Sequence, residues 1–456
     1  MHSMQLTSAA SIVLGKITNP ECLASSQKRS WLNRHRYNTD VPMQKADILV
    51  LSSAIGSGHM RASAALTQGV ELLAPELSCL TVDFPREVSP TTEALLRQAY
   101  LESLKLMPDV YGKIYRMSEI GAFKQGTIHR TSDVYERLAQ ISELWTVRYA
   151  GSYLEGESPD LHNNRLPRRS GLRTLERLVE ETKAKALVAP HFYGAGVLGK
   201  YKEKNPRAFT AAVLTDYVPH PVGVPPNLDL YVVADEAAAE VVEKLGAPEN
   251  HIHPTGIPID PVFEEAADVS GVRQDLLELP AKSEQDDLPI VIVMGGGLGG
   301  GHLESVVASL LEASAAMHLV ILCGSNTTTC ERLRRIAEKR RRSAIFLSFT
   351  DRVRDLMAAS TVLVTKPGGM SCTEALASDL PQVLFNPIPG QEEDNAAAMV
   401  RYGAGVMVKS TGDILGETFK ILTSPNHRRR MIECARAAHH PHSATFAARL
   451  VLDGMP

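Results

Sequence analysis

The chain has 456 residues, of which 44% are hydrophobic and 22% charged, and its formal net charge is -4. This length exceeds that of one ordinary hydrophobic core and is sufficient for two domains of usual size. The lack of a basic excess and an aromatic content of only 5% argue against a nucleic-acid partner. No apolar run approaches the ~20 residues that span a bilayer, so we expect any membrane contact to be peripheral.

The N-terminal segment, residues 1–45, is rich in Ser, Asn and basic residues and has only Glu21 and Asp40 as acids. It lacks the long apolar stretch of a secretion signal, which leaves a targeting segment, a disordered arm or a true start at Met43. The cysteines fit no zinc spacing, and we expect free thiols in a reducing compartment. They are Cys22, Cys79, Cys323, Cys330, Cys372 and Cys434.

The first half alternates strand-like and helix-like segments. Residues 47–53 form an apolar run typical of a buried parallel strand, followed by the glycine turn 54–59 and a helix at about 60–73. We predict further strands at 78–83, 185–190, 209–215 and 228–234, helical segments at 91–149, 171–182 and 235–245, and a basic loop at 151–169. The segment 255–259 ends this unit.

A second alternating unit follows an acidic, polar segment. Its predicted strands are 289–295, 319–324, 344–349, 361–366 and 382–386, with helices between them. Such alternation predicts an α/β fold of two doubly wound, Rossmann-like domains facing a cleft. The predicted limits are an arm at 1–45, a first domain at 46–262, a linker at 263–288, a second domain at 289–440, and a C-terminal helix at 441–456 that packs on the first domain.

His59 closes the turn Gly56-Ser57-Gly58-His59, which joins the first strand to its helix. A neutral imidazole at this place accepts a proton from an attacking hydroxyl, and the positive end of the helix helps to keep it neutral. The alternative is a histidine that caps the helix.

Three further polar residues follow strands of the first domain: His191, Asp216 and His220. Because the carboxyl ends of parallel strands border the cleft, we expect these side chains near it. Asp216 then orients a histidine or acts as the base itself, and the alternative is an aspartate that makes a local turn.

Six glycines in seven residues occupy positions 295–301, between a buried strand and a helix. Backbone N–H groups at such a helix start cradle anions, and a diphosphate is the natural guest. The alternative is a flexible linker.

A second glycine turn, in the segment 365–375, also lies between a strand and a helix. Ser371 and the preceding glycines are candidates for phosphate binding, and Glu374 for the ribose hydroxyls. The alternative is a capping box formed by Ser371 and Glu374. In the next loop, 387–395, amide and carboxyl groups are placed to bind sugar hydroxyls, or else form an acidic first turn of a helix.

The basic run from Arg332 to Arg342 indicates a solvated helix face, with attraction to anionic lipid as the alternative. A second candidate for that contact comprises Arg165, Arg168, Arg169 and Arg173.

In combination and in this order, five segments resemble glycosyltransferase family 28, above all the monogalactosyldiacylglycerol synthases and the processive diacylglycerol glucosyltransferases. The segments are GSGHMRASAAL (56–66), VLTDYVPH (213–220), TGIPIDPVF (255–263), MGGGLGGG (294–301) and TKPGGMSCTEALASDLPQVLFNPIPGQEEDNAAAM (365–399). The resemblance spans roughly residues 47–410.

The resemblance implies a GT-B fold, a UDP-sugar in the second domain and inversion at the anomeric carbon without a metal or other cofactor. By position, the resemblance implies that His59 is the catalytic base. From the strand ends and the glycine turn we predict Asp216 as a second catalytic residue, and Gly58, His191 and His220 as acceptor contacts. The donor contacts implied by the resemblance are Phe349 near the uracil, Glu374 at the ribose, and Gln391, Glu392 and Asn395 at the sugar and diphosphate. The two glycine turns add the predicted donor contacts Gly296, Gly297, Lys366, Gly368, Gly369, Met370 and Ser371.

We therefore expect a cytoplasmic, peripherally membrane-associated hexosyltransferase that uses a diacylglycerol-type acceptor. The segment 218–224 has no tryptophan where the family often has one, and Ala54 replaces an acidic residue of the plant-type enzymes. These departures leave open a soluble small-molecule acceptor. A nucleotide-sugar epimerase and a sensor that binds UDP without turnover are two further alternatives.

Overall fold

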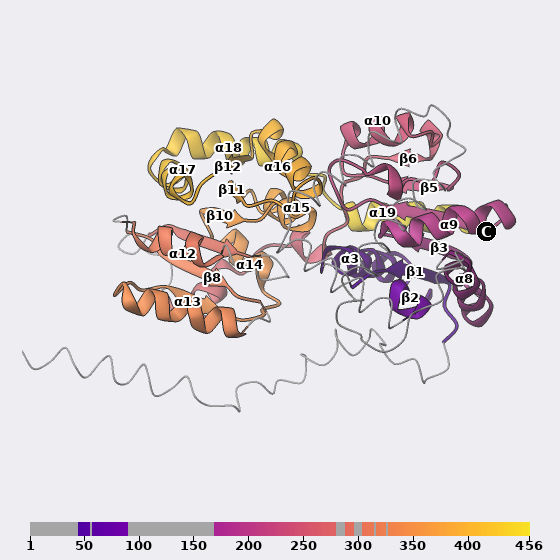
Figure 1. Ribbon diagram of the computed structural model, residues 1–456, viewed down its shortest axis with the longest axis horizontal. Coiled ribbons are helices and arrows are strands. Elements are labelled where there is room, and N and C mark those ends of the chain that lie inside the picture. The colour runs from indigo at the N-terminus through magenta and orange to yellow at the C-terminus, as the bar shows by residue number, and fades with distance from the viewer. Residues whose placement is uncertain are drawn as a thin grey trace, which may run out of the picture. The chain divides into compact units, whose positions relative to one another are not determined.

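The computed structural model describes residues 44–54, 57–89, 168–279, 288–295, 303–313, 316–324 and 327–456. It contains two six-stranded sheets, and every recorded strand pairing is parallel. We call the elements around the first sheet, together with the last helix, the first lobe, and those around the second sheet the second lobe (Figure 1).

The first sheet has the strand order β2-β1-β3-β4-β5-β6. Its strands are β1 (Ile48–Ser52), β2 (Cys79–Asp83), β3 (Ala186–Ala189), β4 (Phe209–Val213), β5 (Leu230–Val232) and β6 (Ile252–His253). Its helices are α3 (Ser57–Leu73), α4 (Phe84–Val88), α8 (Arg168–Thr182), α9 (Phe192–Lys204), α10 (Glu236–Lys244) and α19 (Ser443–Gly454).

Helices cover both faces of this sheet because alternate side chains of each strand point to opposite faces. Ile48 and Val50 of β1 pack in one cluster with side chains of α3 and α19. Leu49 and Leu51 pack in another with side chains of α8 and α9. Each such aliphatic side chain contributes about 1.5–3 kcal/mol on full burial, which explains the continuous apolar run of the strand.

The second sheet has the strand order β12-β11-β10-β7-β8-β9. Its strands are β7 (Ile290–Met294), β8 (His318–Leu322), β9 (Ile345–Leu347), β10 (Val362–Thr365), β11 (Gln382–Phe385) and β12 (Gly405–Val408). Its helices are α12 (Leu303–Leu311), α13 (Thr327–Lys339), α14 (Val353–Ala358), α15 (Gly369–Ala377), α16 (Gln391–Tyr402), α17 (Thr411–Thr423) and α18 (Pro425–Ala438).

Sequence reasoning missed two strands, β6 and β12. β6 has only two residues. β12 begins at Gly405, a poor strand former that lies three residues after the C-terminal end of α16. Part of the predicted linker is packed, because Val272 and Arg273 are buried in the short helical turn η6 (Val272–Leu276), which follows α11 (Val269–Gly271). The predicted domain limits stay a prediction.

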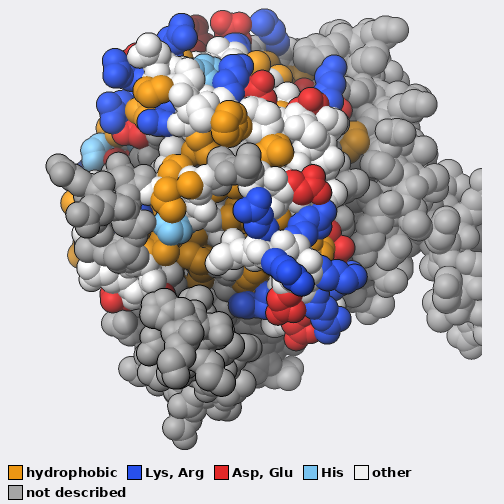
Figure 2. All heavy atoms as spheres, turned by 90° about the vertical axis from the view of Figure 1, so that its left-hand side faces the viewer, with side chains coloured by type: hydrophobic (Ala, Val, Ile, Leu, Met, Phe, Trp, Pro, Cys, Tyr) orange, Lys and Arg blue, Asp and Glu red, His pale blue; other side chains and the backbone are white. Residues whose placement is uncertain are grey.

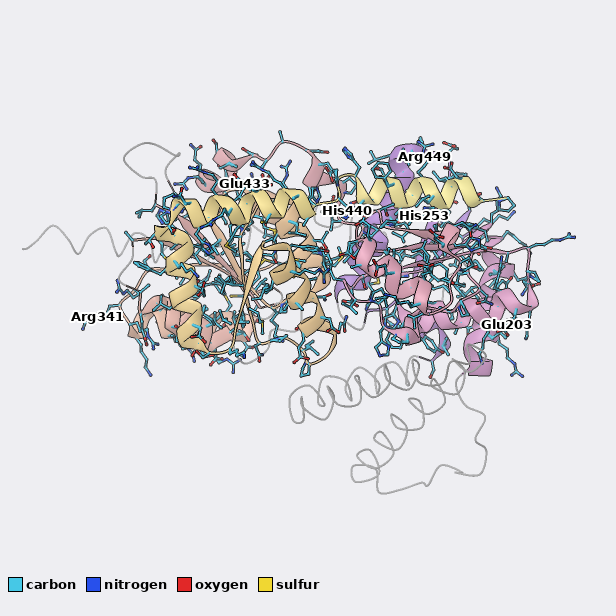
Figure 3. The ribbon with its side chains drawn as sticks, turned by 90° about the horizontal axis from the view of Figure 1, so that it is seen from above. Glu203, His253, Arg341, Glu433, His440 and Arg449 are labelled. Carbon is cyan, nitrogen blue, oxygen red and sulfur yellow. The ribbon has the colours of Figure 1, made fainter. Side chains whose placement is uncertain are left out.

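The chain returns from α18 to α19 through residues 439–442, and His440 lies between the two helices in Figure 3. α19 packs closely on α3. The approach is so close at Gly69 that an added Cβ would lie 2.5 Å from the carbonyl oxygen of Ala444. The last helix of the chain therefore contacts the helix that begins at the predicted catalytic turn.

Candidate functional site

His59 lies in the first turn of α3, which begins five residues after the end of β1. Its Nδ1 is 3.0 Å from the carbonyl oxygen of Pro190 and 3.1 Å from the hydroxyl of Thr215. A carbonyl oxygen only accepts hydrogen bonds, so this contact favours the tautomer with the proton on Nδ1. Nε2 is then the basic nitrogen.

Burial lowers the pKa of His59, and this effect outweighs the opposing influence of Asp216 and of the Pro190 carbonyl. The ring meets that of His191 edge to face, with centroids 4.7 Å apart. Burial and the neighbouring His59 hold the pKa of His191 well below its usual value. The first lobe thus presents two neutral imidazoles side by side.

The backbone around His59 is fixed from within the first lobe. The Ser63 hydroxyl, one turn further along α3, lies 2.8 Å from both the hydroxyl of Ser52 and the carbonyl oxygen of His59. His191 is the N-cap of α9, where its Nδ1 accepts from the backbone N–H of Tyr193 at 3.4 Å. The capping alternative considered for His59 therefore applies to His191.

Asp216 follows β4 and carries a carboxylate that two side chains of α16 contact. Gln391 Nε2 donates to one oxygen at 2.9 Å, and Asn395 Nδ2 donates to the other at 3.0 Å. The backbone N–H of Tyr217 donates to Asn395 Oδ1 at 2.9 Å. Two predicted donor contacts of the second lobe therefore meet a predicted catalytic residue of the first.

The N-cap of α15 is Gly368, and no side chain caps this helix end. Ser371 lies inside the helix, so the predicted alternative of a Ser371–Glu374 capping box is wrong. A Cβ on Gly369 would lie 2.1 Å from the carbonyl oxygen of Thr215, so the approach of the two lobes requires glycine there. Gly368 has more space, because the nearest atom to an added Cβ is Glu392 Oε1 at 4.0 Å.

Met370 and Glu374 turn inward from α15. Met370 is buried and contacts the glycine turn, since an added Cβ on Gly58 would lie 3.5 Å from its Cγ. Glu374 is 1% exposed and forms an ion pair with Arg61 of α3. Its Oε2 is buried with no hydrogen-bond partner among the described residues. Burial lowers the pKa of Arg61 to about 10, with Asp260 opposing the shift.

Sequence reasoning missed Arg61, although the quoted motif at 56–66 contains it. Its position two residues after His59 gave no indication that it faces Glu374, which is more than 300 residues further along the chain. Thr215 was missed for the same reason, since its contact with His59 joins the loop after β4 to the first turn of α3.

Glu392 lies in the first turn of α16, where its carboxylate accepts from the backbone N–H of Ile388 at 2.7 Å. Burial raises the pKa of Glu392, and the charge of Lys366 opposes this rise. Glu393 accepts from the backbone N–H of Gly390, the N-cap residue of α16, at 2.9 Å. The alternative of an acidic first helix turn therefore holds for both residues, and Glu392 additionally feels the charge of Lys366.

The remaining predicted residues are more dispersed. Phe349 follows β9 and is 68% exposed, and His220 is half-buried directly before the turn η3 (Pro221–Gly223). Gly296 and Gly297 lie outside the described residues. In the described part of the chain, no group of three or more His, Cys, Asp or Glu side chains is placed to hold a metal ion. The five described cysteines are free, as predicted.

The basic run on α13 is partly paired. Arg332 contacts Glu304 at 3.0 Å, Arg340 contacts Glu312 at 2.8 Å, and Arg334 lies over the ring of Phe346. Figure 2 shows basic side chains gathered on the second lobe with acidic ones among them. This arrangement favours the solvated helix face. None of the helices within the described ranges has the length and apolarity to cross a bilayer.

Family models match both halves of the chain. The model of monogalactosyldiacylglycerol (MGDG) synthase matches residues 124–259, and that of the glycosyltransferase family 28 C-terminal domain matches residues 290–442. The chain is a relative of the family 28 glycosyltransferases. The resemblance inferred from the sequence motifs is thus confirmed.

Two curated proteins are similar to this chain over most of its length. It is 24% identical to the processive diacylglycerol beta-glucosyltransferase of Bacillus subtilis (strain 168), over 87% of this chain and 92% of that protein. It is also 24% identical to the enzyme of the same name from Staphylococcus carnosus (strain TM300), over 86% of this chain and 88% of that protein.

Solved structures support the fold. MurG of Acinetobacter baumannii matches with a TM-score of 0.54 and 12% identity, over 89% of this chain and 99% of that one. A putative UDP-N-acetylglucosamine 2-epimerase from Listeria monocytogenes matches with a TM-score of 0.53 and 11% identity, over 90% and 95%. The predicted GT-B fold is confirmed.

Proposed function

We propose that this family 28 relative is an inverting, metal-independent glycosyltransferase that moves a hexose from a UDP-sugar to the hydroxyl of a diacylglycerol-type lipid. The observation that carries the proposal is that Asp216 interacts both with the predicted base, His59, and with two predicted sugar-donor contacts, Gln391 and Asn395. The charge of Asp216 acts on the pKa of His59, and its two oxygens accept from Gln391 and Asn395. The curated relatives are named for transfer of glucose to diacylglycerol.

In the proposed reaction, the acceptor oxygen attacks the anomeric carbon from the face opposite UDP. The new carbon–oxygen bond forms as the bond to the β-phosphate breaks, and His59 Nε2 takes the acceptor proton. Asp216 stabilises the imidazolium that results, since its charge favours the protonated ring. A neutral resting His59 suits this role.

The leaving UDP gains negative charge at its β-phosphate. The open start of α15 at Gly368, the ammonium of Lys366 and the predicted cradle at Gly296 and Gly297 are the groups we assign to it. The free Oε2 of Glu374 is an acceptor for a ribose hydroxyl, while Arg61 holds the other oxygen. These assignments need no metal or other cofactor.

A direct assay tests the proposal. The protein is incubated with UDP-glucose or UDP-galactose and vesicles that contain diacylglycerol, with and without EDTA, and the anomeric configuration of the product is read by NMR. We expect a β-linked glycolipid at an unchanged rate in EDTA. No glycolipid from either donor would contradict the proposal, and loss of the rate in EDTA would contradict its metal-independent form.

The segment 218–224, which lacks the tryptophan of the family, favours a second candidate: transfer to a soluble small-molecule acceptor. This candidate predicts turnover in lipid-free solution and no flotation with anionic vesicles. The lipid acceptor, and the peripheral membrane association proposed with it, predict the reverse.

A further inference from the structure

The loop after β4 enters the contact between the lobes through three consecutive residues. The carbonyl oxygen of Thr215 faces Gly369 at the start of α15. Asp216 accepts from Gln391 and Asn395 of α16. The Tyr217 hydroxyl lies 2.9 Å from that of Thr373. Asp216 is the only one of the three whose side chain is charged, and it meets the two amides.

The contacts of Asp216 define how both amides are turned. A carboxylate accepts hydrogen bonds and donates none, so each amide must direct its NH2 group toward it. Both ends of the Asn395 amide are then hydrogen-bonded, because its Nδ2 donates to Asp216 and its Oδ1 accepts from the backbone N–H of Tyr217. Gln391 is different, because its NH2 is held while its carbonyl Oε1 is directed elsewhere.

We propose, building on the transferase function above, that Asp216 is a positioning residue for the donor sugar. It holds the Gln391 amide in the one orientation that offers Oε1 as an acceptor to a hydroxyl of the hexose. The two ends of an amide are nearly equal in shape but opposite in hydrogen bonding, so a flip replaces an acceptor with a donor. Gln391 thus recognises the sugar, and Asp216 sets its orientation.

The substitution Asp216→Asn tests this role with almost no change in shape. The introduced amide has one acceptor and one donor end, so it cannot accept from both neighbours. Asn395 is buried and tied to Tyr217, so it keeps its orientation. Gln391 must therefore flip and direct its NH2 to the hexose.

The measurement is calorimetric binding of UDP and of UDP-glucose without acceptor, which does not depend on His59 chemistry. In the wild type, the hexose should add affinity beyond that of UDP. In Asp216→Asn this increment should fall by about tenfold, as expected for one lost and mismatched hydrogen bond, while UDP affinity is unchanged. The double variant Asp216→Asn/Gln391→Glu should recover most of it, because the introduced carboxylate accepts from both sides.

Asp235→Asn is the matched control. Asp235 is also a first-lobe carboxylate that contacts α16, where it accepts from Arg401 at 3.1 Å and from the Tyr402 hydroxyl at the far end of the helix. It caps α10, a role that Asn fills equally well. This variant should leave the hexose increment unchanged.

Three results would overturn the inference: an unchanged increment in Asp216→Asn, an equal loss in Asp235→Asn, or no recovery in the double variant. Should Asp216→Asn fail to fold, Gln391→Ala leaves the carboxylate in place and must remove the same increment. A wild type that binds neither nucleotide would instead contradict the proposed function itself.

Discussion

The two lobes contribute to the site in different ways. His59 is held by Pro190, Thr215 and Ser63, all within the first lobe. Glu374, Gln391 and Asn395 of the second lobe are held by Arg61 and Asp216 of the first. The base is therefore organised by its own lobe, whereas the donor groups depend on the contact between lobes. Loss of the base should affect the chemical step, and loss of a cross-lobe partner should affect donor binding.

The largest expected effect tests the base side. His59→Ala should lower turnover by roughly 10²–10⁴-fold, the usual contribution of a general base, and leave the Kd for UDP unchanged. The assay is glycolipid formation beside UDP calorimetry. His427→Ala, on α18, is the matched control and should retain full turnover. A parallel loss of UDP binding in His59→Ala would break the distinction between the lobes.

The next effect tests the donor side. Glu374→Gln replaces the free acceptor oxygen and removes the charge opposite Arg61, so the Kd for UDP should rise by roughly 10- to 100-fold, the value of a charge-assisted hydrogen bond. Arg61→Ala should raise the Kd by less, because Glu374 keeps its acceptor. Nucleotide binding that is unaffected in Glu374→Gln would remove this residue from the donor site.

Two adjacent glycines sharpen the comparison further. Gly369→Ala should destabilise the fold by about 1–3 kcal/mol, as overpacking does, because its Cβ meets the Thr215 carbonyl. Gly368→Ala should cost less stability, since its surroundings are open, and should mainly weaken UDP binding. Urea unfolding and calorimetry on both variants give the test. Equal midpoints for the two variants would contradict the close approach of the lobes at Gly369.

The smallest effect concerns pH. The base must be neutral to act, and burial lowers the pKa of His59 below 6.5, so kcat/KM falls only as pH drops through that lowered value. From pH 8 to pH 7 the loss should be less than about one quarter, the limit for an unshifted histidine. A pH–rate profile measures this. An acid limb centred above pH 6.5 would show that another group takes the proton.

Much of the fold was predictable because it depends on local patterns. The apolar runs at 47–53 and 289–295 contain the strands β1 and β7, and the glycine turn at Gly368 and Gly369 follows β10 as predicted. The exceptions are short or atypical: β6 has two residues, and β12 begins with glycine. Ser371 was misjudged as a cap because sequence alone did not reveal that the helix begins two residues earlier, at Gly369.

The sequence by itself determined two parallel α/β units, the resemblance to family 28, and the residue types at each strand end, because hydrophobic period and glycine position act over a few residues. Only the tertiary structure decided which of these residues meet. Arg61 faces Glu374, Asp216 orients Gln391, and Gly369 is needed for the approach of Thr215. Each pair joins residues more than 150 positions apart, so its contact arises from the packing of one lobe on the other.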